Sequence, residues 1–138
     1  MRRYLVVANQ TLDGAHLLDE LRARAKEAPT AFHVLVPAEH HDGGLYTEGE
    51  TRAQAQRRLD AALDAFRATG AVEVTGEVGD HRPLDAISDV VRHQTFDAII
   101  LSTLPLGRSK WLGQDLPSRI RRHVPVALIH VAPEPIVV

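Results

Sequence analysis

Five short apolar runs, separated by longer stretches with helical spacing, constrain the fold of this 138-residue chain more than any other feature. Each run places aliphatic or β-branched residues at consecutive positions, as is typical of strands that helices cover on both faces. The runs are residues 4–8, 32–36, 72–78, 98–101 and 126–131. Alternating strands and helices of this kind predict an α/β fold built around a parallel sheet.

The first two stretches between these runs are predicted to form helices. In the first, apolar residues recur at positions 18, 21, 25 and 28, and Thr11 or Asp13 is expected to cap the helix. In the second, Thr47 and Glu50 have the spacing of a capping box, and Gly70 marks the end of the helix.

Two further helices are expected in the second half of the chain. One begins near Pro83, a favourable residue for a first helical turn. The other covers residues 115–122, with Asp115 as its N-cap and Pro117 in its first turn.

These elements predict one domain, residues 1–138, with an open, doubly wound, five-stranded parallel sheet and helices on both faces. Ligands bind to such sheets beyond the carboxyl ends of the strands, where the strand order reverses. The loops that follow the strands are therefore the expected place for a site. They are residues 9–14, 37–50, 79–83 and the long loop after residue 101.

Composition excludes several classes of protein. The chain has no cysteine, which rules out a disulfide framework and any thiolate metal site or nucleophile, and it is consistent with the cytoplasm. The first apolar run is too short for a signal peptide or a membrane span, so we expect no export and no membrane anchor. The net charge is −2 with acids and bases interleaved, so no nucleic-acid partner is predicted.

The order of several short motifs resembles the universal stress protein family. The motifs are VVANQT, GEVGDHRPLDAI, FDAIILST, a glycine-containing loop and SRIRRHVPVALIHV, and together they cover essentially the whole chain. The resemblance implies the fold predicted above and a module that binds ATP or AMP. It also implies a role in the stress response and a homodimer.

The loop after the fourth strand departs from the family's nucleotide-binding pattern. Members that bind ATP carry a glycine, two residues, a second glycine, nine residues, and then glycine followed by serine or threonine. Here Ser102 takes the place of the first glycine, and position 105 or 106 that of the second. The final pair falls at Gly113 and Gln114, or at Gln114 and Asp115.

The basic residues and glycines of the same loop favour an anion-binding site, whereas its one acidic residue disfavours such a site. Residues 108–122 hold five Lys or Arg and one acid, and Gly107 and Gly113 permit close approach of the backbone to an anion. Asp115, as a helix cap, would compete with an anion for the same N–H groups. In the alternative reading, Asp115 is only a cap, Trp111 and Leu112 fold over the sheet edge, and the basic residues are solvated.

The positions of the loops and the resemblance together predict the residues that contact a nucleotide or another small anion. They are Ala8, Asn9, Gln10 and Thr11 after the first strand, Val36 in the second, and Ser102, Thr103, Gly107, Arg108, Ser109, Lys110, Gly113, Gln114 and Asp115 after the fourth. Asn9 stands where the family has an aspartate on the adenine side.

Histidines and acids suggest two other sites and support neither strongly. Residues 39–44, EHHDGG, would allow a divalent metal, but adjacent ligands point in different directions, and a solvated loop is the expectation. His81 lies at a strand end that faces the same crevice, with an exposed turn residue as the alternative. His33 and His130 lie inside strands and are expected to be core or interface residues with satisfied nitrogens.

No reaction follows from the sequence. It contains no Ser-His-Asp order with a strand-turn-helix nucleophile, no paired carboxylates in a credible cleft and no Walker-type lysine. The leading function is thus a binding module, with a dimeric interaction protein that binds no nucleotide as the alternative, and a slow nucleotide hydrolase as a third reading. The dimer is expected to form through the last strand, from Val126 to Val131, and the C-terminal tail.

Overall fold

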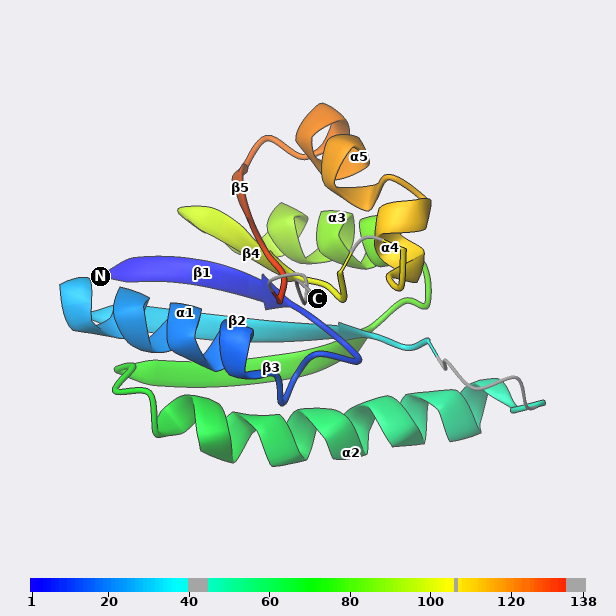
Figure 1. The fold of residues 1–138 in the computed structure, drawn as a ribbon, viewed down its shortest axis with the longest axis horizontal. Coiled ribbons are helices and arrows are strands. Elements are labelled where there is room, and N and C mark those ends of the chain that lie inside the picture. The colour runs from blue at the N-terminus through cyan, green and yellow to red at the C-terminus, as the bar shows by residue number, and fades with distance from the viewer. Residues whose placement is uncertain (40–44, 106, 134–138) are drawn as a thin grey trace, which may run out of the picture.

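The protein is a single five-stranded parallel sheet with helices against both faces (Figure 1). The computed structural model describes residues 1–39, 45–105 and 107–133. The strands are β1 (Arg2–Val7), β2 (Thr30–Pro37), β3 (Glu73–Gly79), β4 (Ala98–Ser102) and β5 (Ala127–Val131), in the order β3-β2-β1-β4-β5. The helices are α1 (Ala15–Glu27), α2 (Glu48–Arg67), α3 (Pro83–His93), α4 (Lys110–Gly113) and α5 (Leu116–His123). The predicted open, doubly wound α/β sheet is confirmed.

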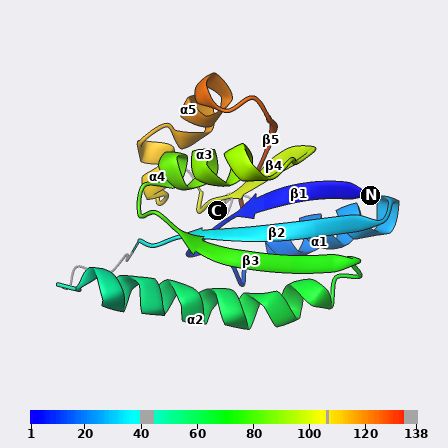
Figure 2. The ribbon, with the colours of Figure 1, turned by 180° about the vertical axis from the view of Figure 1, so that it is seen from behind.

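β1 lies at the centre of the sheet, and its side chains alternate between two apolar cores. Tyr4 and Val6 point into the core that α1 and α2 cover, and Val6 pairs in register with Val34 on one side and Ile100 on the other. Leu5 and Val7 point into the opposite core, under α3 and α5. Figure 2 shows α3 lying across that second face.

The first two helices begin and end close to the predicted positions, with one wrong cap. Thr47 is the N-cap of α2, as predicted, and its hydroxyl accepts a hydrogen bond from the backbone N–H of Glu50 at 3.1 Å. The predicted cap of the first helix by Thr11 or Asp13 is wrong. α1 begins after Gly14 and has no side-chain cap, because the hydroxyl of Thr11 is held by Ser102 instead.

The predicted fourth helix, residues 115–122, is present as α5, and a short helix that was not predicted, α4, precedes it. α4 ends at Gly113 and α5 begins at Leu116, and Asp115 between them has a φ of 55°, in the left-handed region. Asp115 occupies the N-cap position of α5, but its side chain caps no N–H group, so the predicted capping role is wrong. Its backbone N–H instead closes the end of α4 by donating to the carbonyl of Leu112 at 3.1 Å.

No helix in the described part of the chain is long and apolar enough to cross a lipid bilayer.

Candidate functional site

The strand order reverses between β1 and β4, and the loops after these strands meet there as the sequence predicted. They enclose a small pocket at the carboxyl edge of the sheet. Its lining holds seven of the predicted site residues together with Leu104 and the single tryptophan: Asn9, Gln10, Thr11, Ser102, Thr103, Leu104, Ser109, Lys110 and Trp111. The pocket volume is about 20 Å³, which holds little more than one water molecule.

Hydroxyl groups on the pocket floor bond to one another and to a histidine. The Oγ1 of Thr11 lies 2.5 Å from the Oγ of Ser102, which also lies 3.0 Å from Nε2 of His16. Burial lowers the pKa of His16, against a smaller opposing effect of Asp19. A neutral imidazole therefore faces Ser102, and these groups tie the end of β4 to α1.

Both polar groups of the Asn9 side chain form hydrogen bonds to other segments of the protein. Its amide nitrogen donates to the carbonyl of Pro37 at 2.9 Å and to that of Glu39 at 3.2 Å. Its Oδ1 accepts from Nη1 of Arg58 at 2.9 Å. Asn9 therefore positions the loop after β2 and carries no charge for a ligand.

Two more of the predicted phosphate donors have structural partners. The Oγ1 of Thr103 donates to the carbonyl of Leu104 at 2.8 Å and lies 2.8 Å from Nε2 of His130 on β5. Burial, with help from the positive charge of Arg121, lowers the pKa of His130. Ser109 caps α4, where its hydroxyl accepts from the N–H of Leu112 at 3.1 Å.

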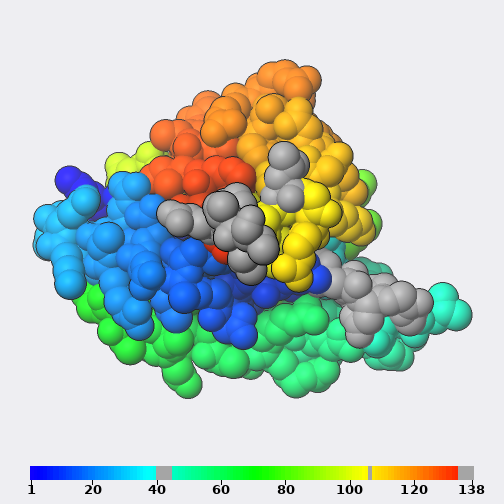
Figure 3. Space-filling model, viewed as in Figure 1, coloured from blue at the N-terminus to red at the C-terminus, as the bar shows by residue number. Residues whose placement is uncertain are grey.

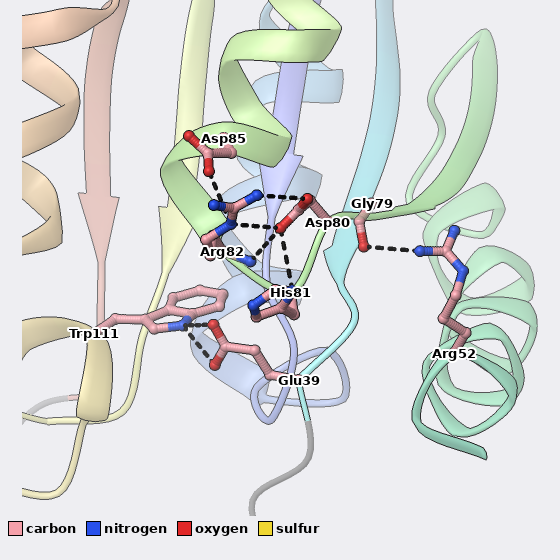
Figure 4. Close-up of polar contacts among 8 residues, drawn as sticks. All are labelled: Glu39, Arg52, Gly79, Asp80, His81, Arg82, Asp85 and Trp111. Carbon is pink, nitrogen blue, oxygen red and sulfur yellow. Dashed lines mark hydrogen bonds and ion pairs between the residues drawn. The ribbon is translucent and has the colours of Figure 1, made fainter. Parts of the chain in front are cut away.

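Trp111 is a packing anchor rather than an exposed ring. Its side chain belongs to the core under α3 and α5, and only 6% of the residue is exposed. The indole Nε1 donates to both carboxylate oxygens of Glu39, at 3.3 and 3.2 Å (Figure 4). Burial raises the pKa of Glu39, although the bond from Trp111 and the charges of Lys110 and His81 oppose that rise.

A much larger crevice lies on the other side of Glu39, beyond the carboxyl ends of β2 and β3. Its volume is about 490 Å³. The lining consists of Ala38, Glu39, Tyr46, Glu48, Thr51, Arg52, Asp80, His81 and Lys110. Lys110 is the residue that lines both this crevice and the small pocket.

The turn after β3 presents His81 to the crevice, as the sequence suggested. Asp80 in this turn accepts hydrogen bonds from the backbone N–H of Arg82 at 2.8 Å and from its Nε at 3.2 Å, and these bonds lower the pKa of Asp80. Arg82 also pairs with Asp85 at 3.0 Å. The charge of Asp80 is thus balanced within the turn, and His81 is left with most of its side chain exposed.

The structure separates the remaining predicted residues. Ala8 and Val36 are completely buried in the core. Gly107, with a φ of 92°, and Arg108 lie exposed at the turn before α4. Gly113 and Asp115 are exposed at the junction of α4 and α5. Gln114 lines a third opening of about 260 Å³, between α3, α4 and α5.

The two strand histidines have partners, as expected. In His33, Nδ1 lies 2.7 Å from Oγ1 of Thr75, and Nε2 lies 2.7 Å from Oε2 of Glu77. The possible metal segment, residues 39–44, lies outside the described residues except for Glu39. The described residues contain no group of three or more His, Cys, Asp or Glu side chains placed to hold a metal ion.

Sequence reasoning missed Tyr46, Thr51 and Arg52, which line the large crevice from the loop before α2 and its first turns. The available signal was the position of these residues after a strand of the sheet, because helix starts also lie at its carboxyl edge. Arg52 donates to the carbonyls of Val78 at 3.3 Å and Gly79 at 3.5 Å, which holds its guanidinium beside the end of β3.

Comparison with known proteins shows a shared fold. The sequence matches no family model and no curated protein. Universal stress protein UspA from Lactobacillus plantarum is similar with a TM-score of 0.71 at 16% identity, covering 94% of this chain and 97% of that one. A universal stress family protein from Arabidopsis thaliana with AMP bound has a TM-score of 0.63 at 11% identity, covering 97% and 93%. A universal stress protein in complex with cAMP has a TM-score of 0.58 at 17% identity, covering 95% and 96%.

Proposed function

We propose that this chain, which has the fold of the universal stress proteins, is a binding module of that kind for a nucleotide such as AMP or ATP, or for another small anion. The ligand lies at the carboxyl edge of the sheet, in the crevice beside Lys110, and the module acts in a stress response as a homodimer. The observation that carries the proposal is the 490 Å³ crevice at this edge. Lys110 lines both this crevice and the small pocket between the ends of β1 and β4, which we call the switch-point pocket.

The size and position of the crevice support a small-molecule ligand. Small-molecule sites have volumes of roughly 300 to 1,000 Å³, and the crevice lies within that range. It also lies at the edge where doubly wound sheets bind ligands. Two solved proteins of the same fold, at 11% and 17% identity, hold AMP and cAMP.

The charges around the crevice support an anionic group near Lys110. Lys110 is exposed and forms no ion pair within the described residues, and Arg52 and His81 lie on the same lining. Of the acids there, Asp80 is paired with Arg82, and the carboxylate of Glu39 accepts hydrogen bonds from Trp111. Glu48 stays as an opposing charge, so we place the phosphate on the Lys110 side.

A second candidate function is a dimeric interaction protein that binds no nucleotide. The closed switch-point pocket favours it, because Asn9, Thr11, Ser102 and Ser109 are all bonded within the protein. A nucleotide that used these groups would first have to break existing hydrogen bonds.

Release of bound nucleotide from the purified protein by denaturation distinguishes between the two candidate functions. Adenine absorbance in the released fraction, identified by chromatography, supports the nucleotide module. Calorimetric titration with AMP and with ATP then measures the affinity. No retained nucleotide and no heat with either ligand would favour the interaction protein.

A further inference from the structure

The segment from Arg108 to Arg122 forms a basic patch at one end of the molecule. The patch consists of Arg108, Lys110, Arg119, Arg121 and Arg122, all of which are exposed, and its one acid is Asp115. Figure 3 shows the segment in yellow and orange, at the upper right of the molecule. The rest of the chain has 11 Lys or Arg against 17 Asp or Glu, a net charge of −6, so the patch is opposite in sign to the remainder.

None of the five cations of the basic patch has a carboxylate partner among the described residues, whereas six of the eleven Lys and Arg residues elsewhere have one. Six arginines on the rest of the surface form ion pairs at 3.0 to 3.5 Å: Arg2, Arg22, Arg24, Arg67, Arg82 and Arg92. No cation of the patch forms an ion pair with a described residue. The other five Lys and Arg residues in the described part of the chain also form no ion pair: Arg3, Arg52 and Arg58 donate to backbone carbonyls or to the Asn9 side chain, and Lys26 on α1 and Arg57 on α2 are exposed without a polar partner.

We propose that the basic patch is a docking surface for an acidic segment of a partner protein. The guanidinium of arginine presents a planar fork of donors that matches a carboxylate. The patch has four such groups, and none of them is paired with a carboxylate of a described residue. The opposite charge of the remaining surface orients the approaching segment towards this end of the molecule.

A groove next to the patch gives the partner an anchoring point. The opening of about 260 Å³ between α3, α4 and α5 is lined by Lys110 and Arg119 of the patch and by the apolar Pro83 and Leu84. Its carboxylates are engaged, because Asp85 pairs with Arg82 and Glu39 accepts from Trp111. One side chain of the partner segment enters this groove, and the acidic residues around it contact the patch.

Other occupants fit the same surface less well. Single-stranded nucleic acid binds through exposed aromatic rings between cations, and Trp111 on this segment is buried. Membrane surfaces are bound through apolar side chains next to cations, and the exposed large apolar residues of the described chain are Met1, Leu45 and Val72, all outside the patch. A two-fold dimer centred on the patch would bring like charges together.

Fluorescence anisotropy with a labelled oligoglutamate peptide tests the proposal. The variant is R119E/R122E, which changes two patch residues that do not line the 490 Å³ crevice. The matched control is K26E/R57E, which changes the net charge equally at exposed positions outside the patch. Circular dichroism checks that both variants are folded.

We expect the wild-type protein to bind the peptide with an affinity that falls as salt rises. R119E/R122E should weaken binding about tenfold or more, and K26E/R57E by no more than about twofold. The proposal is overturned if the peptide does not bind, or if both variants weaken binding equally. It is also overturned if labelled duplex DNA or phosphatidylserine vesicles bind more tightly than the peptide. AMP affinity, measured on the same variants, reports separately on the nucleotide site.

Discussion

The indole Nε1 of Trp111 lies 3.2 Å from Oε2 of Glu39, a residue 72 positions earlier in the chain. The pair joins α4 to the loop after β2. Trp111 lines the small switch-point pocket, Glu39 lines the 490 Å³ crevice, and Lys110 lines both. The hydrogen-bonded pair therefore forms the partition between the two spaces.

Removing the indole donor should destabilise the protein. Trp111→Phe leaves the half-buried carboxylate of Glu39 without its hydrogen bond, so we expect the free energy of unfolding to fall by about 1–3 kcal/mol. Glu39→Gln keeps an oxygen that accepts from the indole and should cost less. Urea unfolding followed by circular dichroism measures both. A Trp111→Phe protein as stable as the wild type would contradict this role for the pair.

Two histidines with lowered pKa values should make stability depend on pH. Burial lowers the folded-state pKa of His16 and of His130, so below about pH 6.5 the unfolded chain binds protons before the folded one does. The free energy of unfolding should therefore fall as the pH is lowered from about 7.5 to about 5. In H16Q/H130Q, whose amides can still bond to Ser102 and Thr103, this fall should be smaller.

The matched control for the pH experiment is His123→Gln at the exposed end of α5. The slope of this variant is the reference with which the slope of H16Q/H130Q is compared. Equal slopes for the wild type and H16Q/H130Q would show that His16 and His130 are not the source of the pH dependence.

Close packing of α2 on β3 should make Gly76 intolerant of a side chain. A Cβ at this position would lie 2.7 Å from Cδ1 of Leu59 and 3.2 Å from the carbonyl oxygen of Val34. We expect Gly76→Ala to lower the free energy of unfolding by about 1–3 kcal/mol. At Gly113, a Cβ meets no atom within 4 Å, so Gly113→Ala should change stability by less than about 1 kcal/mol. Equal effects in urea unfolding would contradict the packing.

The proposed dimer should depend on the C-terminal end of the chain. β5 is an edge strand with Leu128 and Ile129 only half-buried, and an apolar edge of this kind favours a partner. A chain that ends at Ala132 should sediment more slowly than the full chain at the same concentration, because the dimer is weakened. An unchanged sedimentation profile would contradict the proposal that the tail forms part of the dimer interface.

The sequence was sufficient to predict the fold because its signals were local. Consecutive apolar residues marked the strands, and the Thr47 cap and Pro83 marked helix starts where the structure has them. The junction at Asp115 was not predictable in this way. A left-handed conformation is uncommon for a residue other than glycine, and Asp115 adopts it where α4 ends and α5 begins.

The candidate site was predictable in position but not in detail. The loops after β1 and β4 meet as expected, because parallel strands end at the same edge. Whether their polar groups are free depends on partners far away in the chain. His16 and Ser102 are 86 positions apart, and no local pattern indicates that they bond. The large crevice lies among the expected loops, residues 37–50 and 79–83, but Thr51 and Arg52 come from the first turns of α2, beyond those loops, so these lining residues were not predicted.

Calorimetric titration of AMP into the wild-type protein and into Lys110→Gln tests the central claim most directly. If the ligand's phosphate lies beside Lys110, the wild type binds AMP and the variant binds it at least about tenfold more weakly, since a hydrogen bond to a charged group contributes about 1.5–3 kcal/mol. Arg57→Gln on the outer face of α2 is the control and should bind like the wild type. No heat with the wild type, or equal affinity for the wild type and Lys110→Gln, would contradict the account.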